Sequence, residues 1–463
     1  MTAALVNSTL RQRAVRSIPT SGRTLGHCAV GCSAVATVAG IAAGPAAGAA
    51  DLVLMALAVV AFGATLHIER HTPFLTAPLV VSVALATTAA AVLLPPRGSA
   101  DLWSYAMYGR IVVHHGASPY IHRPSEYLTD PLLRLVAPGW RHARSVYGPV
   151  FIGLAAAVSA VAGSSPLANR VGFQLLAATA TLGAMLLLLR RRDAAAAAVV
   201  GLNPVVAASI VNGGHNDALV GLVALGGMLA IGRSRGAVAG VLFGLGALIK
   251  IVVVIPMAAG AVWAWRHDRR RSAASSTAIA AGMTALGYAV VGGRAALDPL
   301  LAAAARVSRA TLWQLGGAHG SVLVHPRMTM AVVAGAVALA LYLRARDQDP
   351  SAAVGAALVA YLLTAPYVLP WYAGWALPVL ATTWRTRLSR VGLTHAALLL
   401  VVYVDAPGLD PDALHNAMRI ISGVTLPVLE GVAVIGLVAA ACRPQLLAHV
   451  RTGSHSAHTV VKR

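Results

Sequence analysis

Long apolar runs recur along almost the whole chain, and they restrict the possible folds more than any other feature. Each run is about 20 residues long, and a helix of that length crosses about 30 Å of hydrocarbon. Only 11% of the 463 residues are charged and 58% are hydrophobic. Inside a bilayer every backbone polar group must be satisfied within the protein, so such runs fold as helices. We therefore expect an all-α, polytopic integral membrane protein.

The positive charge of the chain follows a membrane pattern. The net charge is +21, but the arginines stand in short clusters between apolar runs, as in cytoplasmic loops. We therefore expect membrane lipids and no nucleic acid as partners. The clusters that we place in the cytoplasm are Arg11–Arg23, Arg70, Arg190–Arg192, Arg233 and Arg235, Arg266–Arg271, Arg344 and Arg346, Arg385–Arg390, and the basic tail after Arg443.

These anchors predict roughly 13–14 transmembrane helices with both chain ends in the cytoplasm. Several spans are short for a bilayer, so some are expected to be broken or re-entrant. The expected spans are about 27–47, 51–67, 75–95, 168–189, 194–212, 217–232, 236–249, 251–265, 275–292, 328–343, 352–367, 373–384, 391–405 and 421–441.

The spans divide the chain into five parts. These are a basic N-terminal segment, the first transmembrane helices, an extracytoplasmic loop, a transmembrane core and a basic tail, at 1–26, 27–95, 96–167, 168–441 and 442–463. The apolar segment 149–163 cannot cross the membrane without placing Arg190–Arg192 outside. We expect it to be a juxtamembrane helix at the outer interface, with Pro149 in its first turn.

Arginines in the outer segments oppose the charge rule. An arginine held on this side needs an anionic partner, and a lipid phosphate is the partner that we expect. The arginines of the first outer segment are Arg97, Arg110, Arg123, Arg134, Arg141, Arg144 and Arg170, and those of the second are Arg294, Arg306, Arg309 and Arg327. A third outer segment follows Asp405.

The outer loop begins with a carboxylate and two phenols on one helix face. Ser99 can cap a helix, and Asp101, Tyr105, Tyr108 and Val112 then follow at helical spacing. Such a face could bind a polar acceptor. Alternatively, Asp101 only complements the helix dipole.

Three histidines follow in the same loop. His114, His115 and His122 do not have the spacing of a helical metal-binding pair, and the chain bends between them. The cysteines form neither a disulfide framework nor a zinc site. We expect no metal here, and solvated or sugar-contacting histidines instead.

Further polar and aromatic features lie within the spans or at their ends. The turn from Asn212 to Asp217 reads NGGHND, and it is either a capped hairpin turn or a binding element. Lys250 stands between two apolar runs, which favours a phosphate contact, with snorkelling to the interface as the alternative. The segment 366–372 reads PYVLPWY, which is an aromatic belt by default or, alternatively, a platform for a sugar or a lipid contact. Glu430 lies in the last span without a nameable partner.

Together these segments resemble one family. The motifs are D-x-W-S-Y-A-x-Y-G-R from Asp101, H-G-x-x-P-Y from His115, S-x-Y-G-P from Ser145, and L-N-P-x-x-x-x-x-x-x-N-G-G-H-N-D-A-L from Leu202. They are similar to the actinobacterial polyprenol-phosphomannose-dependent α-1,6-mannosyltransferases of the GT-C class. In that class an acidic residue of the first outer loop is the general base, and Asp101 matches its place. The helix at 149–163 looks like the second juxtamembrane helix of the class.

The resemblance implies an inverting transfer of mannose from polyprenyl phosphate to a cell-envelope glycan or glycolipid, outside the plasma membrane. No metal or other cofactor is expected. Lys250, Arg110 and Arg309 are the candidates for contact with the phosphate. Asp217 is the reserve choice for the base, and Trp371 and Tyr372 could line the prenyl groove. The other candidates for substrate contact are Tyr105, Tyr108, His114, Tyr120, Tyr147, Asn212, His215 and Asn216.

Other functions stay open at this point. Another polyprenyl-phosphate sugar, such as arabinofuranose, would need few changes in the pocket. A lipid-linked sugar flippase would place its charges in a central cavity, and a secondary transporter would show internal repeats, which we do not find. A scaffold without activity would not explain the carboxylate and phenols near Asp101. The acceptor and the oligomeric state are not fixed by the sequence.

Overall fold

The computed structural model describes residues 20–303, 306–316, 326–404 and 413–453, and all structural statements below concern these. They form helices and no strand, which confirms the expected all-α membrane fold. Most of the basic N-terminal segment, the outer segment directly after Asp405 and the end of the basic tail lie outside the described residues. Five helices are long and apolar enough to cross a membrane: Ser21–Ala43, Ala49–His71, Pro166–Leu189, Arg270–Val290 and Asn416–Ala439.

The remaining apolar helices are shorter, so the total of 13–14 spans stays a prediction. In chain order the α-helices are α2 (Thr20–Ala43), α3 (Ala49–His71), α4 (Ala77–Leu93), α5 (Asp101–Val113), α6 (Pro138–Arg141), α7 (Pro149–Ala162), α8 (Pro166–Leu189), α9 (Ala194–Gly201), α10 (Asp217–Gly232), α11 (Gly236–Ala247), α12 (Val254–Arg266), α13 (Arg270–Val290), α14 (Arg294–Ala303), α15 (Pro326–Arg344), α16 (Pro350–Thr364), α17 (Leu377–Ala381), α18 (Arg387–Val402), α19 (Ala413–Ile420) and α20 (Leu426–Gly453).

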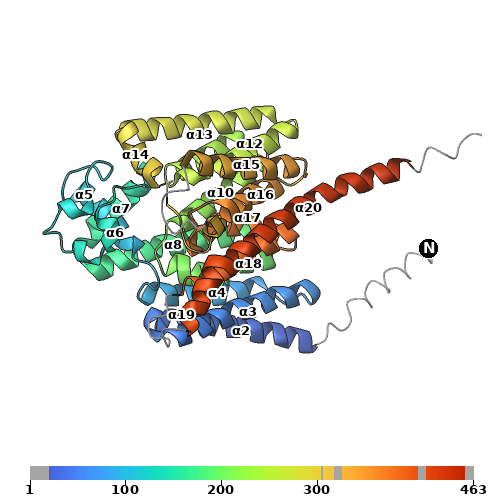
Figure 1. The fold of residues 1–463 in the computed structure, drawn as a ribbon, viewed down its shortest axis with the longest axis horizontal. Helices are drawn as coiled ribbons and strands as arrows, with labels where there is room; N and C mark the ends of the chain where they lie inside the picture. The colour runs from blue at the N-terminus through green and yellow to red at the C-terminus, as the bar shows by residue number, and fades with distance from the viewer. Residues whose placement is uncertain (1–19, 304–305, 317–325, 405–412, 454–463) are drawn as a thin grey trace, which may run out of the picture.

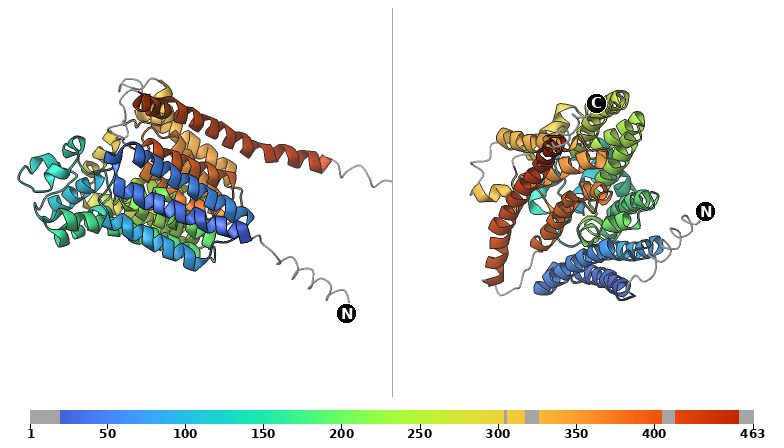
Figure 2. Two further views of the ribbon diagram at one scale, coloured as in Figure 1. Left: turned by 90° about the horizontal axis from the view of Figure 1, so that it is seen from below. Right: turned by 90° about the vertical axis from the view of Figure 1, so that its right-hand side faces the viewer.

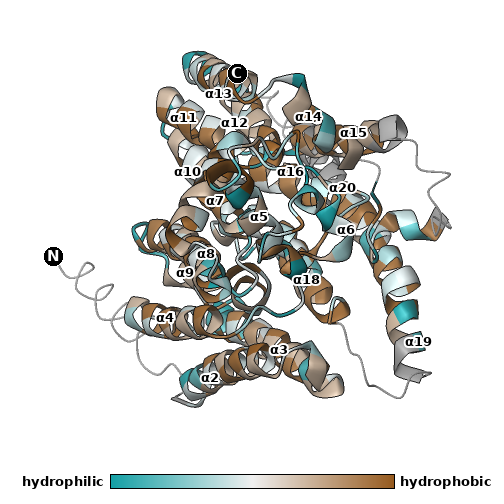
Figure 3. Cartoon of the chain, turned by 90° about the vertical axis from the view of Figure 1, so that its left-hand side faces the viewer, coloured by the Kyte–Doolittle hydropathy of each residue, from teal (hydrophilic) through white to brown (hydrophobic). Residues whose placement is uncertain are grey.

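The helices form a bundle with a separate group at one end. Figure 1 shows α5, α6 and α7 gathered at that end, with α13 along one edge of the bundle and α2, α3 and α4 along the opposite edge. Figure 2 shows α20 on the outside of the bundle. Hydrophobic residues cover the bundle helices, whereas the loops among α5, α6 and α7 carry many hydrophilic residues (Figure 3).

Side-chain caps begin several of these helices. Thr76 Oγ1 accepts a hydrogen bond from Leu79 N at the start of α4, and Ser165 Oγ accepts one from Ala168 N at the start of α8. Both helices also carry a proline in the first turn. A cap satisfies an amide that has no partner within the helix, and proline fits there because it has no amide hydrogen. These local signals set where the spans begin.

As expected, some spans are not continuous α-helices, and two of them are interrupted well inside the predicted range. The span at 194–212 ends as α9 at Gly201 and resumes as a π-helix at Val206–Val211. The span at 373–384 is a 3₁₀ helix at Pro370–Trp375 followed by the five-residue helix α17. Pro204 lies in the first break, where it removes a backbone donor and interrupts the helix. In the second span, Pro370 and Pro378 stand in the first turns of the two helical pieces. Apolar composition alone could not show this, because it is the same in both conformations.

The segment 96–167, the outer loop of the predicted topology, is fastened to the bundle by its backbone. Helix α7 begins at Pro149, as expected. Gly148 N donates to Ile249 O at 3.0 Å, and Val150 N donates to Leu248 O at 2.9 Å. A Cβ at Gly148 would lie 2.2 Å from the Leu248 carbonyl oxygen, so only glycine permits this approach. The loop therefore lies directly against the end of α11, next to Lys250.

A buried ion pair and a buried contact between a histidine and a glutamate tie outlying helices to the bundle. Asp51 of α3 pairs with Arg97, which precedes α5, and Glu430 of α20 lies 2.8 Å from His395 of α18. For Arg97 the expected lipid phosphate is therefore wrong, because a protein carboxylate neutralises the guanidinium in the interior. For Glu430 the sequence offered no partner, since the histidine lies 35 positions away.

Candidate active site

The first turn of α5 places Asp101 at the junction of the outer loop and the bundle. Ser99 Oγ accepts a hydrogen bond from Asp101 N at 3.2 Å, although the N-cap position itself is Ala100. The Asp101 side chain is 16% exposed, and its Oδ2 lies 3.9 Å from Nδ1 of His215. The carboxylate is therefore held at the edge of the protein interior and remains accessible.

His215 stands at the centre of the site. It belongs to the turn before α10, and its imidazole is buried. Nδ1 lies 3.2 Å from Tyr105 Oη and 3.9 Å from Oδ2 of Asp217. The ring is stacked on Trp371, with centroids 4.0 Å apart and an interplanar angle of 14°. Burial lowers the pKa of His215 well below its usual value, so the imidazole is neutral at physiological pH.

Asp217 holds the lysine that the sequence singled out. Lys250 Nζ lies 2.8 Å from Asp217 Oδ1, and the same oxygen accepts a hydrogen bond from Trp375 Nε1. The ammonium also lies 4.5 Å from the ring centroid of Tyr372 and 5.0 Å from that of Trp375. A carboxylate and aromatic faces both favour a cation at this depth. These contacts therefore orient the Lys250 side chain, which is 14% exposed.

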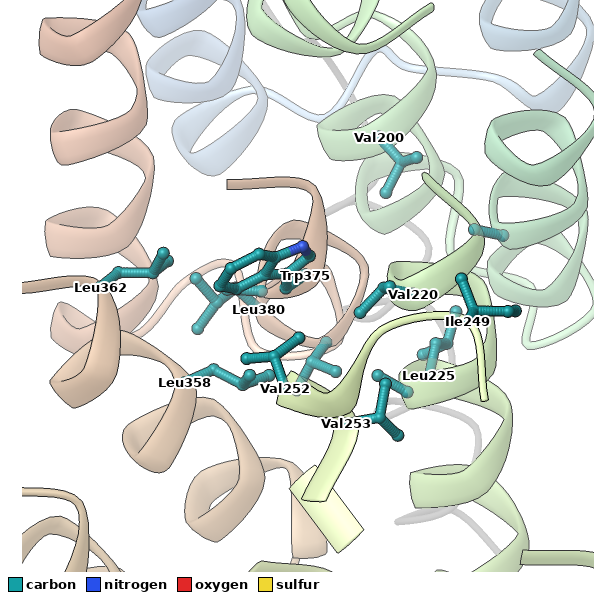
Figure 4. Close-up of a cluster of buried hydrophobic side chains, with 14 of the residues drawn as sticks. Val200, Val220, Leu225, Ile249, Val252, Val253, Leu358, Leu362, Trp375 and Leu380 are labelled. Atoms are coloured by element: carbon teal, nitrogen blue, oxygen red, sulfur yellow. The ribbon is translucent and has the colours of Figure 1, made fainter. Parts of the chain in front are cut away.

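The wall behind this pair is apolar and fixed. The indole of Trp375 is buried among side chains that include Val252, Leu358 and Leu380 (Figure 4). Close packing of this kind leaves little freedom for the indole. The hydrogen bond from Trp375 thus fixes the position of the Asp217 carboxylate, and with it that of Lys250.

Asp101 titrates near neutrality. Burial raises the pKa of Asp101 to about 6, and the negative charge of Asp217 adds to the increase, whereas the positive charges of Lys250 and Arg306 oppose it. The guanidinium of Arg306 lies 4.1 Å from the ring centroid of Trp140 in the outer loop. In the sequence Arg306 is one of several arginines expected to meet a lipid phosphate, and nothing distinguishes it from the others as a residue of the site.

Several buried polar atoms of the cluster lack a hydrogen-bond partner within the described part of the chain. They are His215 Nε2, both amide atoms of Asn216 and Asp217 Oδ2. Buried polar groups in folded proteins nearly always have partners, and leaving one without costs about 1–3 kcal/mol. Three consecutive residues with unmet hydrogen-bonding capacity therefore indicate a place where a ligand binds.

Arg110 does not contact this cluster, and we correct its expected role. Its Nε donates to both oxygens of Asp130, at 3.0 and 2.8 Å, and its Nη1 donates to Gly163 O at 2.7 Å. His115 Nε2 lies 2.9 Å from the same carboxylate. The guanidinium is buried and already neutralised, so it is not placed to bind a phosphate.

Two phenols that we expected to touch substrate have structural contacts instead. Tyr108 Oη donates to Ala143 O at 3.1 Å, and Tyr120 Oη donates to Tyr147 O at 2.9 Å. Both side chains are buried. Tyr147 itself remains close to the site, because Lys250 Nζ lies 5.8 Å from its ring centroid.

The amide of Asn212 is also occupied. Its Nδ2 donates to the carbonyl oxygens of Ala91 and Pro95, at 2.9 Å each, and its Oδ1 accepts from Arg97 N at 2.8 Å. These bonds satisfy backbone groups at the end of α4. Asn212 therefore positions the turn, and we correct its assignment as a substrate contact.

Two remaining candidates lie elsewhere. The Arg309 guanidinium lies 4.4 Å from the ring centroid of Tyr403. Arg306, which precedes it in the same segment, is the arginine whose charge acts on Asp101. His114 is exposed at the end of α5.

Over the described ranges, no group of three or more His, Cys, Asp or Glu side chains could hold a metal ion. Metal independence stays a prediction.

Comparisons with known proteins give two matching families and one relative. Residues 12–267 match the family described as "Alpha-(1->6)-mannopyranosyltransferase, N-terminal domain", and residues 300–436 match the "MptB C-terminal domain". The chain is 28% identical over 368 residues to Alpha-(1->6)-mannopyranosyltransferase A of Mycobacterium tuberculosis, a match that covers 69% of this chain and 67% of the relative. No solved structure matches.

Proposed function

Because this chain belongs to the α-(1→6)-mannopyranosyltransferase family and is a mannosyltransferase, we propose that its donor is mannose linked to a polyprenyl phosphate. The proposed acceptor is a hydroxyl group of a cell-envelope glycan or glycolipid, and the proposed product is an α-1,6 linkage. We place the reaction at the outer face of the plasma membrane, because a polyprenyl donor resides in the bilayer and the cluster lies at a bundle end.

One observation carries the proposal. Asp101 of the outer loop lies beside His215, which in turn lies beside the Asp217–Lys250 pair, although Asp101, the turn at 215–217 and Lys250 are widely separated in the chain. A base that titrates near neutrality and a cation at membrane depth are the two groups that transfer from a lipid phosphate requires.

In the proposed mechanism Asp101 is the general base. Its carboxylate takes the proton of the acceptor hydroxyl as that oxygen attacks the anomeric carbon. The bond from the anomeric carbon to the phosphate oxygen breaks, and polyprenyl phosphate leaves with the bonding electron pair. Attack opposite to the leaving group inverts a β-linked donor to an α-linked product. A base with a pKa close to the working pH suits this task.

Lys250 and Arg306 are the proposed phosphate contacts. Negative charge grows on the phosphate as the bond breaks, and a preorganised cation stabilises that charge most where water is excluded. Asp217 orients Lys250 and accepts two hydrogen bonds on one oxygen, so we assign it to positioning and not to proton transfer. Trp371 and Tyr372 remain candidates for contact with the prenyl chain. We propose no metal or other cofactor.

The first experiment measures transfer of radiolabelled mannose from polyprenyl-phosphate-mannose to a synthetic mannoside, in membranes that contain wild type or Asp101→Asn. Transfer by wild type that is lost in an equally abundant variant supports both the donor and the base. Equal transfer by the two proteins removes Asp101 from the mechanism. Absence of transfer by wild type rejects the donor, and polyprenyl-phosphate-arabinofuranose is then tested in the same membranes.

A further inference from the structure

We propose that Nε2 of His215 accepts a hydrogen bond from a sugar hydroxyl, so that His215 selects a hydroxyl group of the substrate and does not contact the phosphate. This inference rests on the proposed function, and it assigns a specific chemical role to one residue of the turn. It follows from the atoms around the two ring nitrogens.

The oxygens around Nδ1 determine where the imidazole proton resides. Nδ1 faces Tyr105 Oη at 3.2 Å and carboxylate oxygens of Asp101 and Asp217 at 3.9 Å each. A phenol can donate or accept, so Tyr105 is compatible with either tautomer. Ionised carboxylates only accept, and two negative charges beside Nδ1 favour a proton on that nitrogen. The ring therefore carries its proton on Nδ1.

The other nitrogen then has a free lone pair. The imidazole is neutral because burial lowers the pKa of His215, so it has one proton and Nε2 has none. Nε2 is buried and has no hydrogen-bond partner among the residues described. A buried lone pair without a donor costs free energy unless a ligand supplies the donor.

The groups around Nε2 suit a sugar hydroxyl. A Cβ at Gly213 would lie 2.7 Å from Nε2 and 2.4 Å from Cδ2 of His215, so only glycine lets the imidazole pack this closely against the backbone of the turn. Trp371 stacks on the imidazole and fixes its plane. The adjacent Asn216 offers an amide oxygen and nitrogen that also lack partners. A donor and acceptors beside an aromatic ring are the groups that bind sugar hydroxyls.

The lone pair on Nε2 favours a sugar hydroxyl over the phosphate as its ligand. A sugar hydroxyl donates a hydrogen bond, whereas the phosphodiester of the donor has oxygens that only accept and would be repelled by a lone pair. The phosphate is consequently left to Lys250 and Arg306. His215 is a specificity-determining residue in this scheme, and Asp101 remains the base.

The test uses substrate analogues that separate donating from accepting. Monodeoxy and deoxyfluoro mannose at positions 2, 3, 4 and 6 are prepared as an unreactive polyprenyl phosphonate series and as methyl mannosides. Each compound is assayed as an inhibitor of mannose transfer by wild type, His215→Leu and His215→Gln. Fluorine cannot donate a hydrogen bond, so an analogue that replaces the selected hydroxyl by fluorine loses this contact as completely as the deoxy analogue.

We expect one position at which both analogues bind wild type about tenfold or more weakly than the parent compound. That loss should fall below about twofold in His215→Leu and should persist in His215→Gln, because the glutamine amide oxygen still accepts. If the glutamine variant still discriminates between the parent compound and its analogues, the result in His215→Leu reflects the lost hydrogen bond and not a loss of folding. Polyprenyl phosphate without sugar should inhibit wild type and His215→Leu equally.

Three results would overturn the assignment. The first is a fluoro analogue that binds like the parent where the deoxy analogue does not, because His215 would then be a donor. The second is weaker inhibition of His215→Leu by polyprenyl phosphate, which would indicate a phosphate contact. The third is transfer by wild type with no position that depends on His215. Wild type without any transfer rejects the proposed function itself, and the inference with it.

Discussion

Helix α5 has a carboxylate cluster at each end, and the two clusters differ in one respect. At the C-terminal end, Asp130 accepts hydrogen bonds from Arg110, His115 and the Leu132 amide. At the N-terminal end, Asp217 Oδ2 and His215 Nε2 have no partner within the described chain. Both clusters combine carboxylate, histidine and cation, so residue types alone do not distinguish them.

The difference teaches how to separate a structural network from a binding site. Burial opposes ionisation of Asp130, but hydrogen bonds from Leu132, His115 and Arg110 outweigh burial and lower the pKa of Asp130. Burial raises the pKa of Asp101 to about 6. A fully satisfied network stabilises the fold, whereas a network with unmet capacity costs stability and is retained where function needs it.

The largest expected effect is on catalysis at the N-terminal cluster. Asp101→Asn should lower kcat by about 10²- to 10⁴-fold, because a positioned general base contributes that much. The donor KM should change little, since the amide keeps the shape of the carboxylate. The thermal unfolding midpoint at pH 8 should not fall. At this pH Asp101 is ionised, and burial of the ionised carboxylate destabilises the folded protein, as the raised pKa of Asp101 shows. Initial rates and unfolding in detergent check both parts, and a kcat like that of wild type would contradict the first.

The matched change at the other cluster should show the opposite pattern. Asp130→Asn leaves Arg110 buried without its counter-ion, and breaking a buried pair in this way costs about 3–5 kcal/mol. We expect a lower unfolding midpoint and less protein in the membrane, with the kcat of the folded fraction unchanged. A variant as stable as wild type but slow in transfer would remove the distinction between the two clusters.

The cations of the two clusters should differ in donor binding. Lys250→Met should raise the donor KM by about 10- to 150-fold, since a hydrogen bond to a charged group contributes about 1.5–3 kcal/mol. Arg110→Met should destabilise the protein and leave the donor KM of the folded fraction unchanged. Steady-state kinetics with varied polyprenyl-phosphate-mannose compare them. Equal increases in KM would return Arg110 to the phosphate site.

The smallest effect concerns pH. Asp101 must be ionised to take a proton, and its pKa is raised to about 6, so kcat/KM should be nearly constant above pH 7 and fall about tenfold between pH 7 and pH 5. Asp130 has a lowered pKa and should not contribute to this decline. Asp130→Asn should therefore keep the acid limb, and Asp101→Asn should lose it. An acid limb that is unchanged in Asp101→Asn would assign the titration to another group.

Some site residues could be predicted from the sequence and others could not. Asp101, His215 and Lys250 are conspicuous because polar residues at span ends need a reason. Arg306 carried no distinguishing signal, and its neighbour Arg309 was selected instead. Arg110 and Asn212 looked equally functional in the sequence, but each is occupied by a partner that is 20 or more positions away. Sequence spacing reveals contacts along one helix, not those across the bundle.

The sequence by itself determined that the chain is helical and spans the membrane, because the length of an apolar run is a local property and the thickness of the bilayer sets the length that a spanning helix needs. It also fixed the start of α7 at Pro149 and drew attention to Asp101. Only the tertiary structure decided which polar groups are satisfied within the protein and which have no partner among the described residues. That decision depends on approach between distant segments, such as Gly148 against Leu248, and the packing of the whole bundle sets these distances.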